Sequence, residues 1–214
     1  MYRRWTLCGI VVASLAIVPP GNPQGETQLR GVERYSAGEY REAEKELRKA
    51  LEAEPENLTA KYYLGLTLLQ LEQYGEAERE LRGARALLQE GKGAGPRRDQ
   101  IEVGLARACM EQKQYDEARA ALDQAQEEKP DNPEVFLYRG KLELHRDNHA
   151  GAVKALERAI ELDPKRAYSH YYAGIAYGNL KRPDKMAEHF RYFLKLAPEA
   201  PEANKVRSYL KSLR

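Results

Sequence analysis

The residues best suited to metal chemistry are His145 and His149, which stand four positions apart with Asp147 between them. On one continuous helix, such a pair can present two imidazole nitrogens to a zinc ion. Here the polar run from His145 to His149 is typical of a turn between two helices, and the pattern implies no third ligand. We therefore favour a polar turn and expect neither a metal nor another cofactor.

The other candidates for catalytic chemistry are a glycine-rich segment and the abundant carboxylates. Residues 91–98 contain three glycines, but they lack the GxxxxGK[ST] order of a phosphate-binding loop and follow no predicted strand. No Gly-x-Ser-x-Gly sequence occurs. The carboxylates alternate with lysines and arginines, as in residues 42–46, which is typical of solvated helix faces. The sequence predicts a protein that is not an enzyme.

Charge and cysteine content narrow the classes of partner. The formal net charge is only +2, and basic and acidic residues are interleaved, so no field attracts nucleic acid and we expect no nucleic-acid partner. Cys8 and Cys109 form no CxxC pair, which argues against a zinc ribbon or a thioredoxin-like site. Cys109 stands in an apolar stretch and is expected to be a small core residue.

Residues 1–25 differ in composition from the rest of the chain. Arg3 and Arg4 precede an almost wholly apolar run, Trp5 to Val18, which ends in residues 19–25, rich in proline and glycine. This order is typical of a secretory signal and predicts an exported protein, periplasmic or secreted. An uncleaved N-terminal anchor is the alternative, and only then would we expect membrane contact, although the apolar run is short for a span of about 20 residues.

The remainder of the chain carries an internal repeat of 34 residues. An alanine marks each unit, a small residue stands twelve positions before it, and a large apolar residue stands four positions after it. The alanines are Ala43, Ala77, Ala118 and Ala152, followed by Met186; the small residues are Gly31, Gly65, Ala106, Gly140 and Gly174; the large ones are Leu47, Leu81, Leu122, Leu156 and Phe190. The units are 24–57, 58–91, 99–132, 133–166 and 167–200, with an insertion at 92–98.

Each unit is expected to contain two antiparallel helices. In the fourth, Asn132 can cap a helix whose first position is Pro133, and a turn near Asp147 leads into a second amphipathic series that begins at Ala152. The small residues allow the two helix backbones to approach closely. Residues 201–214 are expected to form one further helix that covers the last exposed face.

The pattern resembles the tetratricopeptide repeat (TPR) family over residues 24 to about 200, and the fit is best in residues 115–130 and 38–55. The resemblance implies an all-α fold, a right-handed α-solenoid of about five helix-turn-helix repeats with a C-terminal capping helix. It also implies that the first helix of each repeat lines a concave groove that binds a protein or peptide.

Carrying the family's groove positions onto this chain gives a set of candidate partner-binding residues. They are Tyr62, Leu66, Leu69 and Gln70 in repeat 2; Val103, Arg107, Met110 and Glu111 in repeat 3; Leu137, Lys141, Leu144 and His145 in repeat 4; and Tyr168, Tyr171 and Ile175 in repeat 5. The set is apolar and aromatic, with three basic groups near its middle, so we expect an extended or helical peptide with acidic residues. Alternatively, some of these side chains only pack neighbouring first helices together.

Three functions remain open from the sequence. The first is a protein-binding scaffold, in an exported or envelope assembly. The second is a structural module that self-associates as a homo-oligomer. The third is an accessory subunit whose partner chain carries the activity.

Overall fold

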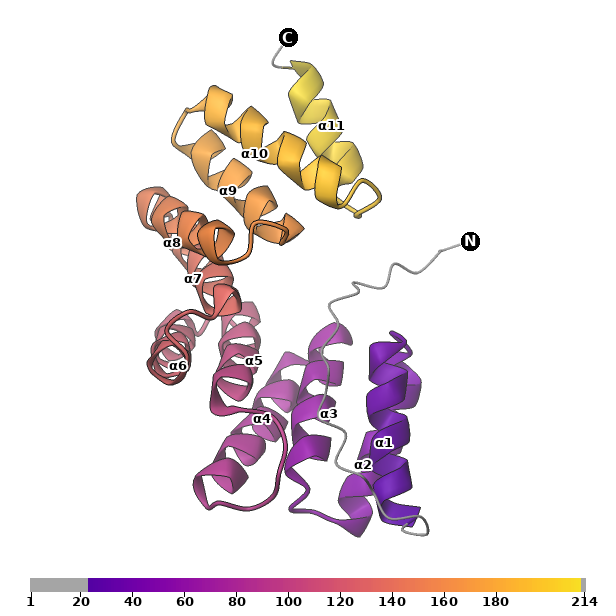
Figure 1. The fold of residues 1–214 in the computed structure, drawn as a ribbon. Helices are drawn as coiled ribbons and strands as arrows, with labels where there is room; N and C mark the ends of the chain where they lie inside the picture. The colour runs from indigo at the N-terminus through magenta and orange to yellow at the C-terminus, as the bar shows by residue number, and fades with distance from the viewer. Residues whose placement is uncertain (1–22, 213–214) are drawn as a thin grey trace. The chain divides into compact units, whose positions relative to one another are not determined.

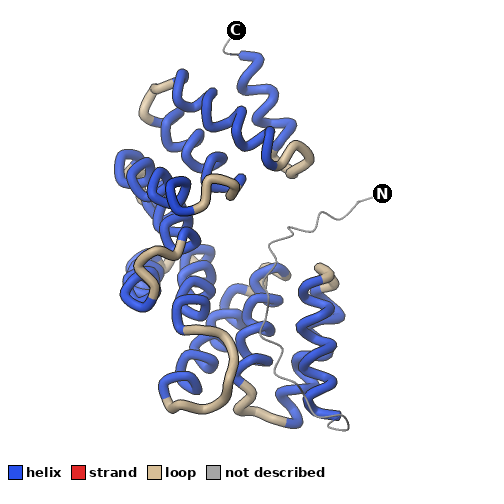
Figure 2. The backbone as a smooth tube through the Cα atoms, in the orientation of Figure 1, coloured by secondary structure: helices blue, strands red, loops and turns tan. Residues whose placement is uncertain are grey.

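The computed structural model describes residues 23–212, and within this range the chain is built of helices joined by turns, with no strand (Figure 2). Residues 1–22 of the expected leader and residues 213–214 of the expected capping helix lie outside the described residues. Among the described helices, none combines the length and the apolar character that a membrane crossing requires.

Eleven helices follow one another along the described chain (Figure 1). They are α1 (Pro23–Ser36), α2 (Tyr40–Ala53), α3 (Leu58–Gln70), α4 (Tyr74–Gln89), α5 (Arg98–Glu111), α6 (Tyr115–Glu128), α7 (Pro133–His145), α8 (His149–Leu162), α9 (Ala167–Asn179), α10 (Pro183–Leu196) and α11 (Ala203–Ser212). The chain falls into two compact units that divide between Gln114 and Tyr115. We call residues 23–114 the N-terminal unit and residues 115–212 the C-terminal unit. The repeat boundaries expected from the sequence stay a prediction.

Asparagine side chains cap the N-termini of several helices. The Asn132 side chain accepts a hydrogen bond from the Glu134 amide at 2.9 Å, and Pro133 is the first residue of α7, so the expected cap is confirmed. The Asn57 side chain accepts from the Ala60 amide in the same way, also at 2.9 Å. These contacts satisfy amide donors that have no partner within the helix.

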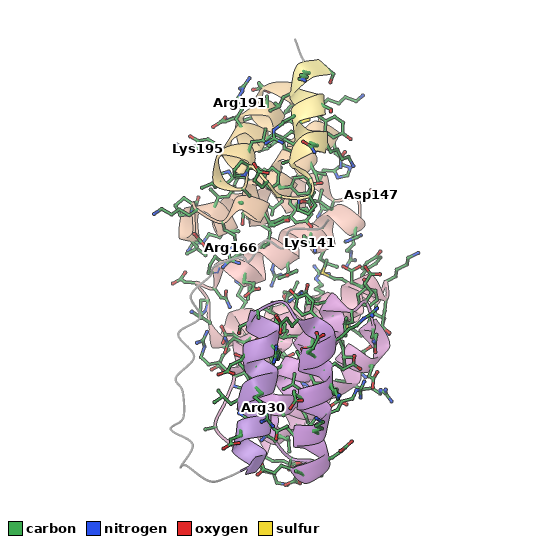
Figure 3. All side chains as sticks on the ribbon, turned by 90° about the vertical axis from the view of Figure 1, so that its right-hand side faces the viewer. Arg30, Lys141, Asp147, Arg166, Arg191 and Lys195 are labelled. Atoms are coloured by element: carbon green, nitrogen blue, oxygen red, sulfur yellow. The ribbon has the colours of Figure 1, made fainter. Side chains whose placement is uncertain are left out.

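One residue with a left-handed backbone closes the first helix of every pair. These residues are Gly38 (φ 73°), Glu72 (φ 61°), Lys113 (φ 62°), Asp147 (φ 56°) and Lys181 (φ 58°); Figure 3 shows Asp147 in the turn after α7. After α3, the Gln73 amide donates to the Leu68 carbonyl at 2.9 Å and the Glu72 amide donates to the Leu69 carbonyl at 3.4 Å. This hydrogen-bond pattern ends a helix tightly and favours glycine at the left-handed position.

Replacing Glu72 by glycine is therefore expected to stabilise the protein. A left-handed backbone costs a residue with a side chain about 1–2 kcal/mol, and glycine's extra entropy in the unfolded chain offsets part of this. We expect the free energy of unfolding in urea to rise by about 0.5–1 kcal/mol. The matched change, Gly38→Ala, should lower it by about 1 kcal/mol. If Glu72→Gly destabilises the protein, the turn is not strained as we describe.

The insertion between α4 and α5 is attached to the start of α3 rather than standing apart. The Thr59 hydroxyl donates to the Ala94 carbonyl at 3.3 Å, and Lys92 pairs with Glu56 at 2.7 Å. Helix α4 ends before Gly91, whose positive φ of 70° lets the chain turn into the insertion.

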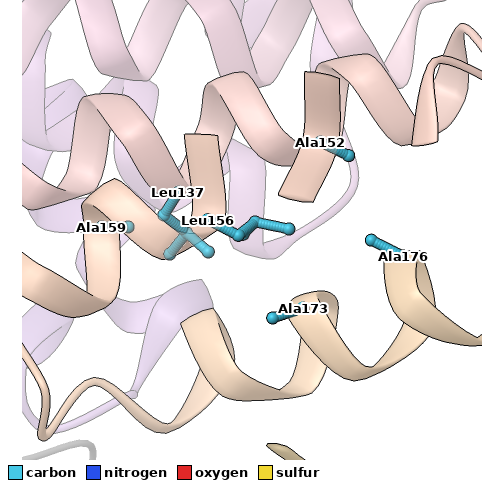
Figure 4. Close-up of a cluster of buried hydrophobic side chains, with 6 residues drawn as sticks. All are labelled: Leu137, Ala152, Leu156, Ala159, Ala173 and Ala176. Carbon is cyan, nitrogen blue, oxygen red and sulfur yellow. The ribbon is translucent and has the colours of Figure 1, made fainter. Parts of the chain in front are cut away.

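The core of the C-terminal unit consists of leucines facing alanines. Figure 4 shows Leu137 and Leu156 side by side, with Ala173 and Ala176 on the neighbouring helix α9 turned toward them. Leu156, Ala173 and Ala176 are fully buried, and Leu137 is 6% exposed. Small residues on one helix and large ones on the next allow close packing without voids.

Helix α11 covers the end of this unit. Ala203 and Val206 are buried, and Val206 packs with Phe190 and Phe193 of α10. Tyr209 is 46% exposed, and its ring stacks on that of Phe190 at 6.2 Å.

Candidate functional site

In the N-terminal unit, most of the candidate groove residues are buried. Tyr62 and Leu66 on α3 are each 8% exposed, and Val103 and Met110 on α5 are each 3% exposed. A partner could contact little of these four side chains. For them, burial favours the alternative drawn from the sequence, that they pack helices together.

The polar candidates of the same unit remain accessible. Gln70 and Glu111 are exposed, and Arg107 is half-buried. Aromatic side chains also meet in this unit: the Tyr63 ring lies 5.2 Å from the Tyr62 ring and 5.6 Å from the Tyr35 ring. Tyr63 lies outside the candidate set because the family's groove positions do not include it. Tyr35 stands at the position of Leu69 one repeat earlier, but the candidate set contains no residue of repeat 1.

The C-terminal unit offers more aromatic surface. Tyr168, Tyr171 and Ile175 on α9 are half-buried, and all three pack against the cluster around Phe190 and Phe193. The Tyr171 ring lies 5.1 Å from the Phe193 ring, and the Tyr168 ring lies 5.9 Å from it. The core of the last helix pair thus holds the two candidate tyrosines in place.

Lys141 on α7 is held between two rings that the sequence reasoning missed (Figure 3 shows the lysine). Its Nζ atom lies 5.1 Å from the centre of the Tyr138 ring and 5.2 Å from that of Tyr172. A cation over the face of an aromatic ring is stabilised by the ring's quadrupole. The signal in the sequence was the density of tyrosine in α9, which contains Tyr168, Tyr171, Tyr172 and Tyr177.

The remaining candidates of this unit differ in exposure. Leu137 is buried, Leu144 is half-buried, and His145 is exposed with its ring stacked on Tyr115 at 5.7 Å. We call Tyr138, Lys141, Tyr168, Tyr171 and Tyr172 the tyrosine–lysine surface. All five are half-buried, so part of each side chain reaches solvent.

Three tyrosine hydroxyls of this surface, those of Tyr168, Tyr171 and Tyr172, have raised pKa values and stay protonated at neutral pH. Burial, together with nearby Glu202, raises the pKa of Tyr168 to about 12. Its hydroxyl donates a hydrogen bond to the Glu202 carboxylate at 3.1 Å. Burial also raises the pKa of Tyr171 and Tyr172. The surface therefore presents neutral hydroxyls and one lysine.

The histidine pair considered for zinc binding is divided by a turn. Helix α7 ends at His145 and α8 begins at His149, so the two side chains do not share a helix face. Among residues 23–212, no three His, Cys, Asp or Glu side chains are grouped closely enough to hold a metal ion. Cys109 is 3% exposed.

A sequence profile of the tetratricopeptide repeat family matches four overlapping segments of the chain. The matched residues are 29–94, 78–133, 103–167 and 137–201. The chain belongs to the tetratricopeptide repeat family. The helix pairs and their close crossing are thus those of a TPR protein, and the expected all-helical repeat fold is confirmed.

Solved TPR structures share the fold at low sequence identity. TTC0263, a thermophilic TPR protein of Thermus thermophilus, has a TM-score of 0.75 at 19% identity, over 88% of this chain and 99% of its own. MamA from Desulfovibrio magneticus RS-1 has a TM-score of 0.64 at 18% identity, over 85% and 98% of the two chains. YrrB, described as a TPR protein with an unusual peptide-binding site, has a TM-score of 0.57 at 21% identity, over 85% and 90%.

One curated relative is similar in sequence over part of its length. Cell division cycle protein 27 homolog A of Arabidopsis thaliana is 30% identical over 118 residues. The match covers 55% of this chain and 16% of the relative, so the chain spans only a small part of that protein.

Proposed function

We propose that this TPR protein is a non-catalytic scaffold that binds a protein or peptide segment on the tyrosine–lysine surface. The observation that carries the proposal is Lys141, a half-buried cation held between two tyrosine rings. Tyrosine supplies a large contact area at low entropic cost, and its hydroxyl can hydrogen-bond a peptide backbone. The fold supports such a role, and the TPR neighbour YrrB is itself described as having a peptide-binding site.

The charges favour an acidic partner. The exposed His145 imidazole lies one turn from Lys141 on the same helix, and the Tyr172 hydroxyl beside Lys141 is a neutral donor. A carboxylate placed at Lys141 would gain a charge-assisted hydrogen bond. Arg107 is a third candidate cation, in the N-terminal unit.

A charge reversal tests this proposal. Immobilised residues 26–214 are incubated with an array of random acidic peptides and their Gln- and Asn-substituted counterparts. We expect preferential capture of the acidic set and a loss of about tenfold or more in affinity with Lys141→Glu, because a like-charge contact costs at least about 1.4 kcal/mol.

The matched control is Lys154→Glu, an exposed lysine of α8 that should leave capture unchanged. Thermal melting of both variants separates lost binding from lost folding. Equal capture by Lys141→Glu and the unmodified chain would contradict the proposal.

Self-association is the second candidate function, because the described chain exposes several large hydrophobic residues. Its exposed large hydrophobic residues are Leu180, Tyr192, Leu196 and Tyr209, at 36–48% exposure, and all four lie between residues 180 and 209. Tyr192 and Leu196 stand one turn apart on α10, and exposed apolar surface of this kind is typical of interaction sites. A stable dimer in light scattering that dissociates on Tyr192→Ser with Leu196→Ser would favour this candidate.

Export rests on the composition of residues 1–25 alone. We propose a periplasmic or secreted protein, with membrane anchoring if the segment is retained. Mass spectrometry of the protein from its native cells tests this. A cleaved N-terminus supports export, an intact apolar segment in the membrane fraction supports anchoring, and an intact chain in the cytosol rejects both.

A further inference from the structure

Two histidines from different helices meet inside the last helix pair. His170 of α9 is 5% exposed, and its Nδ1 lies 3.2 Å from Nδ1 of His189 on α10. The Nε2 of His170 lies 3.2 Å from the carbonyl oxygen of Pro164, in the turn before α9. The pair therefore connects α9, α10 and the preceding turn at one point.

These contacts fix the protonation state of His170. The Pro164 carbonyl can only accept a hydrogen bond, so Nε2 of His170 must carry the proton. In the neutral ring Nδ1 then has a lone pair, and Nδ1–H of His189 donates to it. A first proton can be accommodated, because His189 can carry its hydrogen on Nε2 and accept from Nδ1–H of His170. When both rings are protonated, two Nδ1–H groups face each other and this hydrogen bond is lost.

An aromatic ring stacks on each histidine. The Tyr192 ring of α10 lies 5.1 Å from the His170 ring, and the Tyr177 ring of α9 lies 5.4 Å from the His189 ring. His170 is buried and His189 is half-buried, and this burial stabilises the neutral imidazoles, because a buried charge loses its hydration.

The charged groups around the pair are engaged elsewhere. From α8, Glu157 accepts a hydrogen bond from the Tyr177 hydroxyl. On α10, Glu188 is paired with Lys185 at 2.9 Å. No carboxylate of the described chain is hydrogen-bonded to either imidazole.

Two arginines near the pair are engaged as well. Arg182, after α9, lies over the Tyr177 ring at 5.6 Å. In the turn, Arg166 is paired with Asp163 at 3.3 Å. Asp163 is thus engaged by Arg166, whereas Arg182 packs on a ring.

We propose that the His170–His189 pair is an acid-sensitive latch, which holds α9 and α10 together at neutral pH and releases them when the imidazoles take up protons. The latch makes the structural order of α9 and α10 depend on pH, independently of what the tyrosine–lysine surface binds.

The sign of the pH dependence follows from burial. Burial lowers the pKa of His170, and burial together with neighbouring His170 lowers the pKa of His189. The unfolded chain therefore takes up these protons first as the pH falls below about 6.5. The pair's contribution to stability is complete above that pH and is lost as the pH falls through the two lowered pKa values.

Hydrogen exchange of the full chain at pH 7.5 and pH 5.0 tests the latch. After correction for the intrinsic exchange rates, we expect the protection of α9 and α10 to fall by about tenfold or more between the two pH values, and that of α3 and α4 to change much less. The His189→Asn variant should show a smaller fall, because the asparagine amide can donate to Nδ1 of His170 and does not titrate.

The matched control is His145→Asn, which removes an exposed histidine and should leave the fall unchanged. An equal loss of protection in α3 and α4, or the same fall in His189→Asn as in the unmodified protein, would overturn the latch. If His189→Asn does not fold, an NMR titration of the unmodified protein decides. Both imidazoles should titrate below the ordinary histidine pKa, and titration at or above it rejects the proposal.

Discussion

Replacing Gly140 by alanine is expected to lower the free energy of unfolding by about 2 kcal/mol, although alanine ordinarily stabilises a helix interior by about 1 kcal/mol relative to glycine. A Cβ atom at position 140 would lie 2.4 Å from Cγ and 2.7 Å from Cδ2 of Leu156. Leu156 is fully buried, so it cannot move aside without disturbing the core. Overpacking therefore outweighs helix propensity.

A double substitution identifies the cause. Leu156→Ala alone should cost about 2–5 kcal/mol, and Gly140→Ala in that background should cost nothing or stabilise, because the clashing atoms are gone. The control is Gly75→Ala, where the nearest atom to a Cβ would be 3.5 Å away and alanine should stabilise. Urea unfolding measures the free energy of unfolding of all four variants against the unmodified protein. If the losses in stability from Gly140→Ala and Leu156→Ala simply add in the double variant, close crossing of the helices is not the reason for glycine at position 140.

Replacing Phe193 by alanine is expected to destabilise the C-terminal unit by about 3–5 kcal/mol. Phe193 is fully buried, and its ring contacts both Tyr168 and Tyr171. The cavity would lie between α9, α10 and α11, so these helices should lose order together. Urea unfolding followed by near-ultraviolet circular dichroism reports both the stability and the tyrosine packing.

A second substitution at position 193 probes the tyrosine–lysine surface. The milder Phe193→Leu should cost about 1–2 kcal/mol, since a leucine fills most of the volume. If Tyr168 and Tyr171 bind a partner, Phe193→Leu should weaken binding at a temperature where the variant is fully folded. Unchanged binding would exclude these two tyrosines from the contact. A loss of stability under about 1 kcal/mol for Phe193→Ala would show that the core around it is not tightly packed.

The helices were predictable because they depend on local spacing. The alanine, the small residue and the large apolar residue recur with the helix period, and capping by Asn132 needs only neighbours along the chain. The turn between His145 and His149 was predictable for the same reason. Most of the left-handed turn residues were not, since Glu72, Lys113 and Lys181 are of types that rarely adopt a positive φ.

The exposure of the site could not be predicted from the repeat register. The register says which face of a first helix a residue occupies, but not how closely the next first helix approaches it. Tyr62 and Leu66 are buried, whereas Tyr171 and Ile175, at the same positions of repeat 5, remain half-buried. The place of Lys141 between two rings depends on Tyr172, which is 31 residues away in the sequence.

For the same reason, the contact between His170 and His189 could not be predicted from the sequence. The two residues are 19 positions apart and belong to different helices, so no sequence spacing marks them as neighbours. Only the packing of α9 against α10 brings their imidazoles together.

Within each unit, helices contact only those one or two places away in the chain. Such a molecule has low contact order, so little loop-closure entropy opposes its folding. Pulled from its two ends, it should not rupture in one event, because no helix contact ties distant parts of either described unit together. We expect it to unravel helix pair by helix pair, each 34-residue repeat adding about 110–120 Å of extended chain.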